Sequence, residues 1–180
     1  MKKLRNLAFI DGQNLTQNMK NAKNPWKIDL IKFRIFLQDK YKCDKVYYFI
    51  GIKQKENENL YKFLKHVGYE IVFREHDSKS KGTKKTNVDT DIVFSMMEHA
   101  YRKKDCSKLV LVSNDGDYFK TINCLIKDKK LCAIMFPSEH SSSLYRKIDS
   151  KFIVKLYHRH NRPQLELKKW RRLLWRTNTQ

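Results

Sequence analysis

The stretch LVLVSNDGDYF, residues 109–119, predicts both the fold and the position of its functional site. Its first four residues are all apolar, which indicates a strand buried on both faces, as central strands of parallel sheets are. Five polar or flexible residues follow at once, from Ser113 to Asp117. They fall at the carboxyl end of the strand, where open α/β sheets bind their ligands.

Further apolar runs alternate along the chain with patterns of helical spacing. Strands are expected at residues 7–10, 46–50, 69–73, 109–112, 131–136 and 152–156. Helices are expected at residues 29–40, 56–66, 89–102, 118–129 and, as a short one, 142–148. This alternation predicts right-handed crossovers and an α/β fold, a three-layer α/β/α sandwich with a central parallel sheet. Residues 1–156 are expected to form this domain, and 157–180 a basic C-terminal extension.

The charge of the chain favours a polyanionic partner. Its 39 Lys and Arg against 19 Asp and Glu give a net charge of +20. Such an excess attracts RNA, DNA or anionic lipid. A Lys-, Asn- and Ile-rich composition also arises in AT-rich genomes without selection for binding, so the charge alone does not decide the function.

The cysteines and the short apolar runs indicate a cytoplasmic protein. Cys43, Cys106, Cys124 and Cys132 form no C-x-x-C pair and are expected to be free thiols in a reducing compartment. No signal peptide is visible, and the first apolar run, residues 7–10, is far shorter than the ~20 residues of a membrane span. No stable membrane insertion is therefore expected.

Asp11 follows the first expected strand in the sequence FIDGQN, residues 9–14. If this strand is central, the carboxylate lies at the same sheet edge as residues 114–117. Gly12 is expected to let the backbone turn sharply there. The alternative is a loop aspartate that caps the next helix or turn.

Asp115 and Asp117 form the most suggestive acidic pair. Two carboxylates this close repel each other unless a cation or protons intervene. Mg²⁺ and Mn²⁺ prefer oxygen ligands, so a divalent metal is the expected partner. The alternative is a turn in which Asp117 caps the following helix while Tyr118 and Phe119 pack inward.

Asp89 and Asp91 stand in the first turn of an expected helix. Acidic residues there commonly do no more than interact with the helix dipole. If the strands expected at residues 7–10 and 109–112 are neighbours, the acidic positions fall at the same sheet edge, which favours a shared site.

Four motifs together resemble the NYN domain, a branch of the PIN-like nuclease superfamily that includes LabA-type proteins. They are FIDGQN (9–14), KKTNVDTD (84–91), LVSNDGDYF (111–119) and SSSLYRKIDSKF (141–152), within a resemblance that covers residues 7–156. The resemblance implies a parallel sheet whose first strand lies between the second and the fourth, and RNA cleavage that depends on Mg²⁺ or Mn²⁺. The catalytic residues that it implies are Asp11, Asn14, Asp89, Asp115 and Asp117. The four aspartates would hold the metal, and Asn14 would orient ligands or a water.

The chain departs from the family pattern at two positions. Many relatives have an acidic residue where this chain has Ser95, and relatives often read SGD where this chain has Asn114. Ser95 weakens a second metal site, although Asp91, one turn earlier on the same helix face, is an additional candidate ligand. An alternative function is therefore a catalytically weak or inactive RNA-binding regulatory module. A phosphatase of the haloacid dehalogenase kind is disfavoured because its D-x-D motif needs a second acidic residue two positions after the first, and this chain has Gln13 there, two positions after Asp11.

Two basic segments are candidates for nucleic-acid binding. The first is a loop with Lys79, Lys81, Lys84 and Lys85. The second is a helix expected at residues 165–175, which would present Lys168, Lys169 and Arg172 to phosphates and Trp175 to a base. The alternatives are a solvated loop, and a tail that docks on the domain or lies on an anionic membrane.

Overall fold

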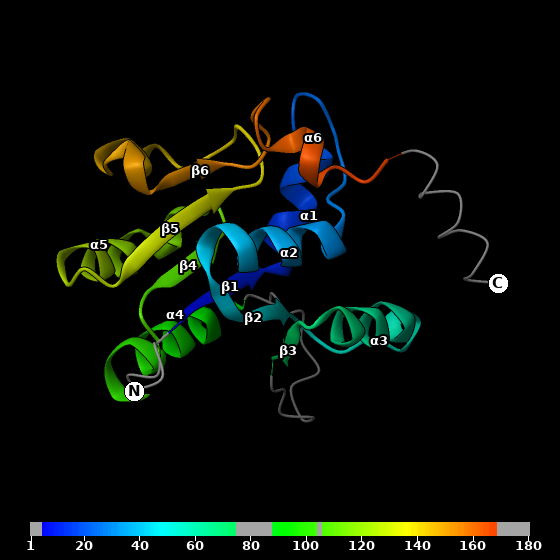
Figure 1. Cartoon of the computed structure of the whole chain (residues 1–180), viewed down its shortest axis with the longest axis horizontal. Coiled ribbons are helices and arrows are strands. Elements are labelled where there is room, and N and C mark those ends of the chain that lie inside the picture. Colours follow the sequence, from blue (N-terminus) through cyan, green and yellow to red (C-terminus); the bar gives the residue numbers. More distant parts are fainter. Residues whose placement is uncertain (1–4, 75–87, 104–105, 169–180) are drawn as a thin grey trace, which may run out of the picture.

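The central sheet has six strands, all paired in parallel. The computed structural model describes residues 5–74, 88–103 and 106–168. The strands are β1 (Asn6–Asp11), β2 (Cys43–Ile50), β3 (Glu70–Phe73), β4 (Leu109–Val112), β5 (Leu131–Phe136) and β6 (Ile153–Lys155). Their order is β3-β2-β1-β4-β5-β6, so β1 lies between β2 and β4 as expected (Figure 1).

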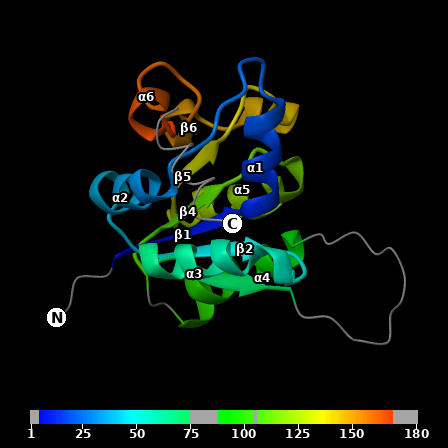
Figure 2. The same ribbon diagram turned by 90° about the vertical axis from the view of Figure 1, so that its right-hand side faces the viewer.

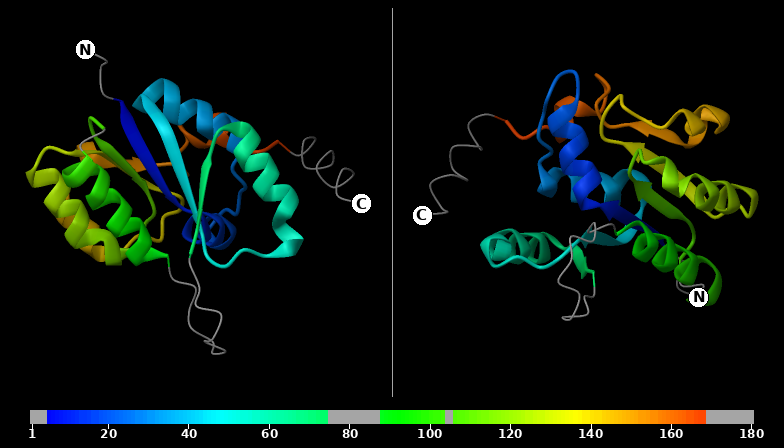
Figure 3. Two further views of the ribbon diagram at one scale, coloured as in Figure 1. Left: turned by 90° about the horizontal axis from the view of Figure 1, so that it is seen from below. Right: turned by 180° about the vertical axis from the view of Figure 1, so that it is seen from behind.

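Helices cover both faces of this sheet, which confirms the three-layer α/β/α architecture. One face carries α1 (Gly12–Asn21), α2 (Leu30–Tyr41) and α3 (Glu58–Val67), and the other carries α4 (Asp89–Met97) and α5 (Phe119–Lys127) (Figures 2 and 3). Strand β1 shows why both layers form. Ala8 and Ile10 pack into the α1–α3 side, whereas Phe9 packs into the α4–α5 side, because successive side chains of a strand point to opposite faces.

Short turns complete the elements. They are the 3-10 turns η1 (Lys55–Asn57), η3 (Gly116–Tyr118), η4 (Ser143–Lys147) and η5 (Ser150–Phe152), the π turn η2 (Glu98–Lys103) and the short helix α6 (Arg162–Leu165). The helix expected over residues 89–102 is therefore α-helical only to Met97 and closes with the π turn.

Helix α1 was not expected from the sequence. Its segment is mostly polar, and only Leu15 and Met19, one turn apart, face the core with Gly12. So short an apolar stripe gives little periodic signal. The helix is nevertheless well started, because the Asp11 carboxylate accepts a hydrogen bond from the Asn14 N–H at 2.9 Å.

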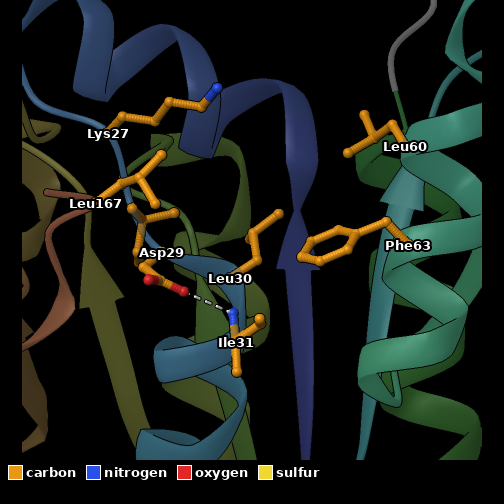
Figure 4. A pocket seen from close by; sticks show the side chains of 8 residues that line it. Lys27, Asp29, Leu30, Ile31, Leu60, Phe63 and Leu167 are labelled. Carbon is orange, nitrogen blue, oxygen red and sulfur yellow. Dashed lines mark hydrogen bonds between the residues drawn. The ribbon is translucent and has the colours of Figure 1, made fainter. Parts of the chain in front are cut away.

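The described part of the C-terminal extension packs on the domain in a different conformation from the one expected. Helix α6 ends at Leu165, and Glu166 pairs with Ile28 in an antiparallel bridge. The prediction of a helix that begins at residue 165 is therefore wrong for residues 166–168, the part of it that the structure describes. Leu165 is buried, and Leu167 lines a small apolar pocket with Leu30, Leu60 and Phe63 (Figure 4). The rest of the expected helix, with Lys169, Arg172 and Trp175, lies outside the described residues, and the division at residue 156 stays a prediction.

Among the described residues, no helix is both long and apolar enough to cross a membrane.

Candidate metal centre

The carboxyl ends of the central strands bring the predicted acidic segments together. Ile10 of β1 pairs with Val112 of β4, so Asp11 and the loop that follows β4 emerge at the same edge of the sheet. Helix α4 begins at that edge with Asp89, on the α4–α5 face. Segments from three parts of the sequence therefore meet there, as predicted.

Three carboxylates form a close group. One oxygen from each of Asp89, Asp115 and Asp117 lies within 4.8 Å of the others. Asp89 is half-buried and Asp117 is exposed, so solvent reaches the group. In the described part of the chain, no Lys or Arg forms an ion pair with Asp115 or Asp117. The repulsion between these carboxylates is thus left for protons or a cation to relieve.

Asp11 stands beside this group and is 4% exposed. Burial, and to a lesser degree the neighbouring charges of Asp89 and Asp115, raise the pKa of its carboxyl from 3.8 to about 6. The hydrogen bonds from the Asn14 N–H and from the Tyr118 hydroxyl oppose this rise. Asp11 both caps α1 and belongs to the acidic edge, so the two interpretations of this residue are compatible.

Tyr118 links two of the acidic segments from inside. Its fully buried side chain donates its hydroxyl to Asp89 Oδ1 at 2.5 Å and to Asp11 Oδ2 at 3.1 Å. A hydroxyl has one proton, so the two carboxylates share it. Burial, together with the two carboxylates, raises the pKa of Tyr118 well above its usual range. The sequence predicted an inward-facing ring but not this polar link.

The 3-10 turn η3, which follows β4, has Asp115 and not Asp117 as its N-terminal cap. The Asp115 carboxylate accepts a hydrogen bond from the Asp117 N–H at 3.1 Å and begins the turn η3. The suggested capping role of Asp117 is therefore wrong, because Asp115 occupies the N-terminal position. The Asp117 carboxylate is left at the exposed side of the group.

Two asparagines fix the loop against α1. The Asn114 N–H donates to the Asn14 Oδ1 at 3.3 Å. The buried Asn114 amide donates to Asn18 Oδ1 at 3.0 Å and to the His140 carbonyl at 2.7 Å. Asn14 thus positions the loop that carries Asp115, and its expected role in orienting ligands or a water stays a prediction. The Asn114 side chain therefore ties its own loop to α1 and to the segment around His140.

The segment 142–145 holds the loop from the other side. The Ser142 N–H donates to the Asn114 carbonyl at 3.2 Å, and the Tyr145 hydroxyl donates to the Asp115 carbonyl. Gly116 is needed for this contact, since a Cβ there would lie 2.6 Å from the Ser142 Oγ. The SSSLYRK motif therefore shapes the acidic loop, a contact that could not be inferred from the sequence.

Gly12 is required for packing and not for a sharp turn. It starts α1 with no positive φ, and a Cβ there would lie 2.7 Å from the Phe49 carbonyl and would overlap the Tyr48 ring. The helix can approach β2 this closely only without a side chain.

The close group fits a small divalent cation. Carboxylate oxygens are the donors that Mg²⁺ and Mn²⁺ prefer. An ion with ligands at about 2.1 Å holds any two of them at most about 4.2 Å apart. The three carboxylates would have to close by only a fraction of an ångström, which rotation of the partly exposed aspartates can supply.

The remaining predicted residues lie elsewhere or outside the described residues. Asp91 is half-buried, and it does not join the close group of described carboxylates because two positions along a helix turn it about 200° from Asp89. Ser95 is half-buried on α4. Lys168 is exposed next to Leu167. Lys79, Lys81, Lys84 and Lys85 fall outside the described residues, and their binding role stays a prediction.

Comparisons with known proteins agree with this architecture. The sequence profile of the family described as "NYN domain" matches residues 6–159. A crystal structure of a Vibrio parahaemolyticus protein of unknown function is similar to this chain, with a TM-score of 0.70 and 18% sequence identity. The similarity covers 93% of this chain and 99% of that one. No curated protein matches the sequence.

Proposed function

Because the chain belongs to the NYN domain family, a branch of the PIN-like nuclease superfamily, we propose that it is a metal-dependent ribonuclease. The observation that carries the proposal is the convergence of Asp89, Asp115 and Asp117 to within 4.8 Å, beside the buried Asp11. The reaction is hydrolysis of an RNA phosphodiester bond. Assignment to the LabA-like branch stays a prediction.

The four aspartates have distinct parts in this proposal. Asp89, Asp115 and Asp117 would hold Mg²⁺ or Mn²⁺, and Asp11, whose pKa is about 6, would complete the site from its buried side. A divalent ion bound there supplies neutralisation of phosphate charge and a water of lowered pKa. Asn14 is a positioning residue, because its amide oxygen fixes the backbone of Asn114.

The basic charge of the chain supports a polyanionic substrate. The acidic edge repels phosphates, whereas the net charge of +20 attracts them over longer distances. RNA is the proposed substrate, and DNA of the same sequence is the comparison. We also propose a cytoplasmic location, because all four cysteines are free thiols.

The test is cleavage of labelled single-stranded RNA and DNA with Mn²⁺ or Mg²⁺, with and without a chelator. Asp115→Asn keeps the size of the side chain but removes its charge and is expected to lower cleavage at least about a hundredfold. Asp39→Asn, an exposed aspartate of α2, is the matched control and should cleave as the wild type does. Equal cleavage by all three proteins, or cleavage that survives the chelator, would contradict the proposal.

A second candidate is an RNA-binding module with weak or no turnover. The observation that favours it is Ser95, which puts a hydroxyl on α4 where many relatives have an acidic residue. Tight RNA binding without metal-dependent cleavage of several RNA substrates would favour this function over the nuclease.

A further inference from the structure

A second cavity opens next to the acidic edge, on the α1–α3 face of the sheet. Its volume is about 340 Å³, which is within the range of small-ligand pockets. It lies where β2 ends and where α1 and α3 begin. Its lining includes Gly12, Gln13, Tyr48, Gln54, Asn57 and Tyr61.

The cavity adjoins the proposed metal centre. Gly12 is the neighbour of Asp11 in the sequence, and the charge of Asp11 helps to raise the pKa of Tyr48 to about 12, after burial as the main cause. Because the sheet order is β2-β1-β4, the cavity and the Asp115 loop flank β1 on opposite sides. Two strand spacings amount to roughly 10 Å. A single strand whose phosphate lies at the carboxylates would therefore carry a nearby base to the cavity.

The chemistry of the lining suits a nucleobase. The rings of Tyr48 and Tyr61 are 7% and 5% exposed and give the cavity rigid aromatic walls. At its rim the Asn57 Nδ2 donates to Gln54 Oε1 at 2.9 Å. Among the described residues, this leaves the Gln54 amide nitrogen as a donor and the Asn57 amide oxygen as an acceptor, with no other side-chain partner. Neighbouring donors and acceptors are the pattern that base edges present.

We infer that this cavity binds one nucleobase of the RNA strand whose phosphate lies at the carboxylate group. The inference rests on the proposed function, and it assigns base preference to Gln54 and Asn57. Apart from Gly12 and Gln13, which belong to the FIDGQN motif, the lining residues belong to segments that none of the acidic motifs contains, so the cavity can be altered without changing a carboxylate.

The test measures RNA binding and metal binding separately. The proteins are the wild type, the double variant Gln54→Ala/Asn57→Ala, and the control Asn59→Ala, an exposed residue of α3 that does not line the cavity. Fluorescence anisotropy with short phosphorothioate RNA homopolymers of each base gives the Kd and the base preference. Calorimetric titration with Mn²⁺ gives the metal affinity. A matching RNA with one abasic position probes the cavity directly.

The double variant is expected to raise the Kd roughly tenfold, as the loss of two hydrogen bonds would, and to bind the four homopolymers alike. The abasic RNA should bind more weakly to the wild type but not to the double variant. Asn59→Ala should match the wild type, and all three proteins should bind Mn²⁺ equally. An unchanged Kd and base preference in the double variant, with cleavage intact, would overturn the base site and leave the nuclease standing. The protein could instead show a base preference that depends on Gln54 and Asn57 without ever cleaving RNA. That result would support the base site and contradict the proposed nuclease activity.

Discussion

The Tyr118 hydroxyl lies 2.5 Å from Asp89 Oδ1, so a buried tyrosine joins the loop after β4 to the start of α4. The same hydroxyl reaches Asp11 at 3.1 Å. In the absence of metal it supplies the proton that these two carboxylates share. The acidic edge is therefore organised before any cation binds.

Tyr118→Phe tests this link, because the change keeps the ring and removes the hydroxyl. Loss of a hydrogen bond to charged groups is expected to lower the free energy of unfolding by about 1.5–3 kcal/mol in the presence of a chelator. Tyr41→Phe is the control, since no hydrogen bond of its hydroxyl occurs within the described residues. Chemical denaturation gives both values. Mn²⁺ should still bind to Tyr118→Phe, and complete loss of binding would show that the site depends on the Tyr118 hydroxyl.

Asp11→Asn is expected to stabilise the metal-free protein at neutral pH. Because the pKa of Asp11 rises from 3.8 to about 6 on folding, the folded state binds this proton more tightly than the unfolded state does. In the wild type, the proton bound by Asp11 therefore stabilises the folded state by roughly 3 kcal/mol below about pH 4, and this contribution is lost as the pH rises through 6. The variant has no such proton to lose.

The measurement compares the free energy of unfolding of wild type and Asp11→Asn at pH 4 and pH 7.5 in a chelator. The difference in favour of the variant should grow between the two pH values, and saturating Mn²⁺ should reduce it by stabilising the wild type. A difference that is the same at both pH values would mean that Asp11 keeps an ordinary pKa in the folded protein.

Gly116→Ala should disturb the acidic loop without touching a carboxylate. The added Cβ would lie 2.6 Å from the Ser142 Oγ and force the two segments apart. Such overpacking typically costs about 1–3 kcal/mol, and Mn²⁺ affinity should fall with it because Asp115 and Asp117 move. The double variant Gly116→Ala/Ser142→Gly removes the obstacle and should recover much of both losses. If neither loss is recovered, the effect of Gly116→Ala arises from the backbone conformation at residue 116 and not from the contact with Ser142.

RNA affinity should fall steeply with ionic strength. The net charge of +20 favours release of counterions from the RNA when it binds. Between 50 and 200 mM salt, a KM increase of at least about tenfold is expected, whereas kcat should change little. A KM that is independent of salt would show that the basic charge has no part in substrate capture.

The sequence was sufficient to predict the sheet because its central strands are buried on both faces. The runs that became β1, β4 and β5 are continuously apolar, and a parallel sheet necessarily gathers their carboxyl ends. The meeting of Asp11 with the Asp115 loop follows from that rule and from the order of strands in the family.

Contacts between polar side chains from distant segments were beyond prediction. Tyr118 and Asp11 are 107 positions apart, and Asn14 meets Asn114 across 100. Whether such a pair forms depends on differences of a few tenths of an ångström between atoms in the packed structure. Such differences leave no periodic pattern in the sequence. Helix α1 was missed for a related reason, since it is held by its cap and by two apolar side chains.

The most direct test of the metal centre is a crystal structure of the protein soaked in Mn²⁺, with anomalous data collected for manganese. A peak bound by Asp115 together with Asp89 or Asp117, on the side of the group that faces Asp11, is the predicted result. A well-ordered site without manganese at saturating concentration, or manganese bound only away from these four aspartates, would contradict it.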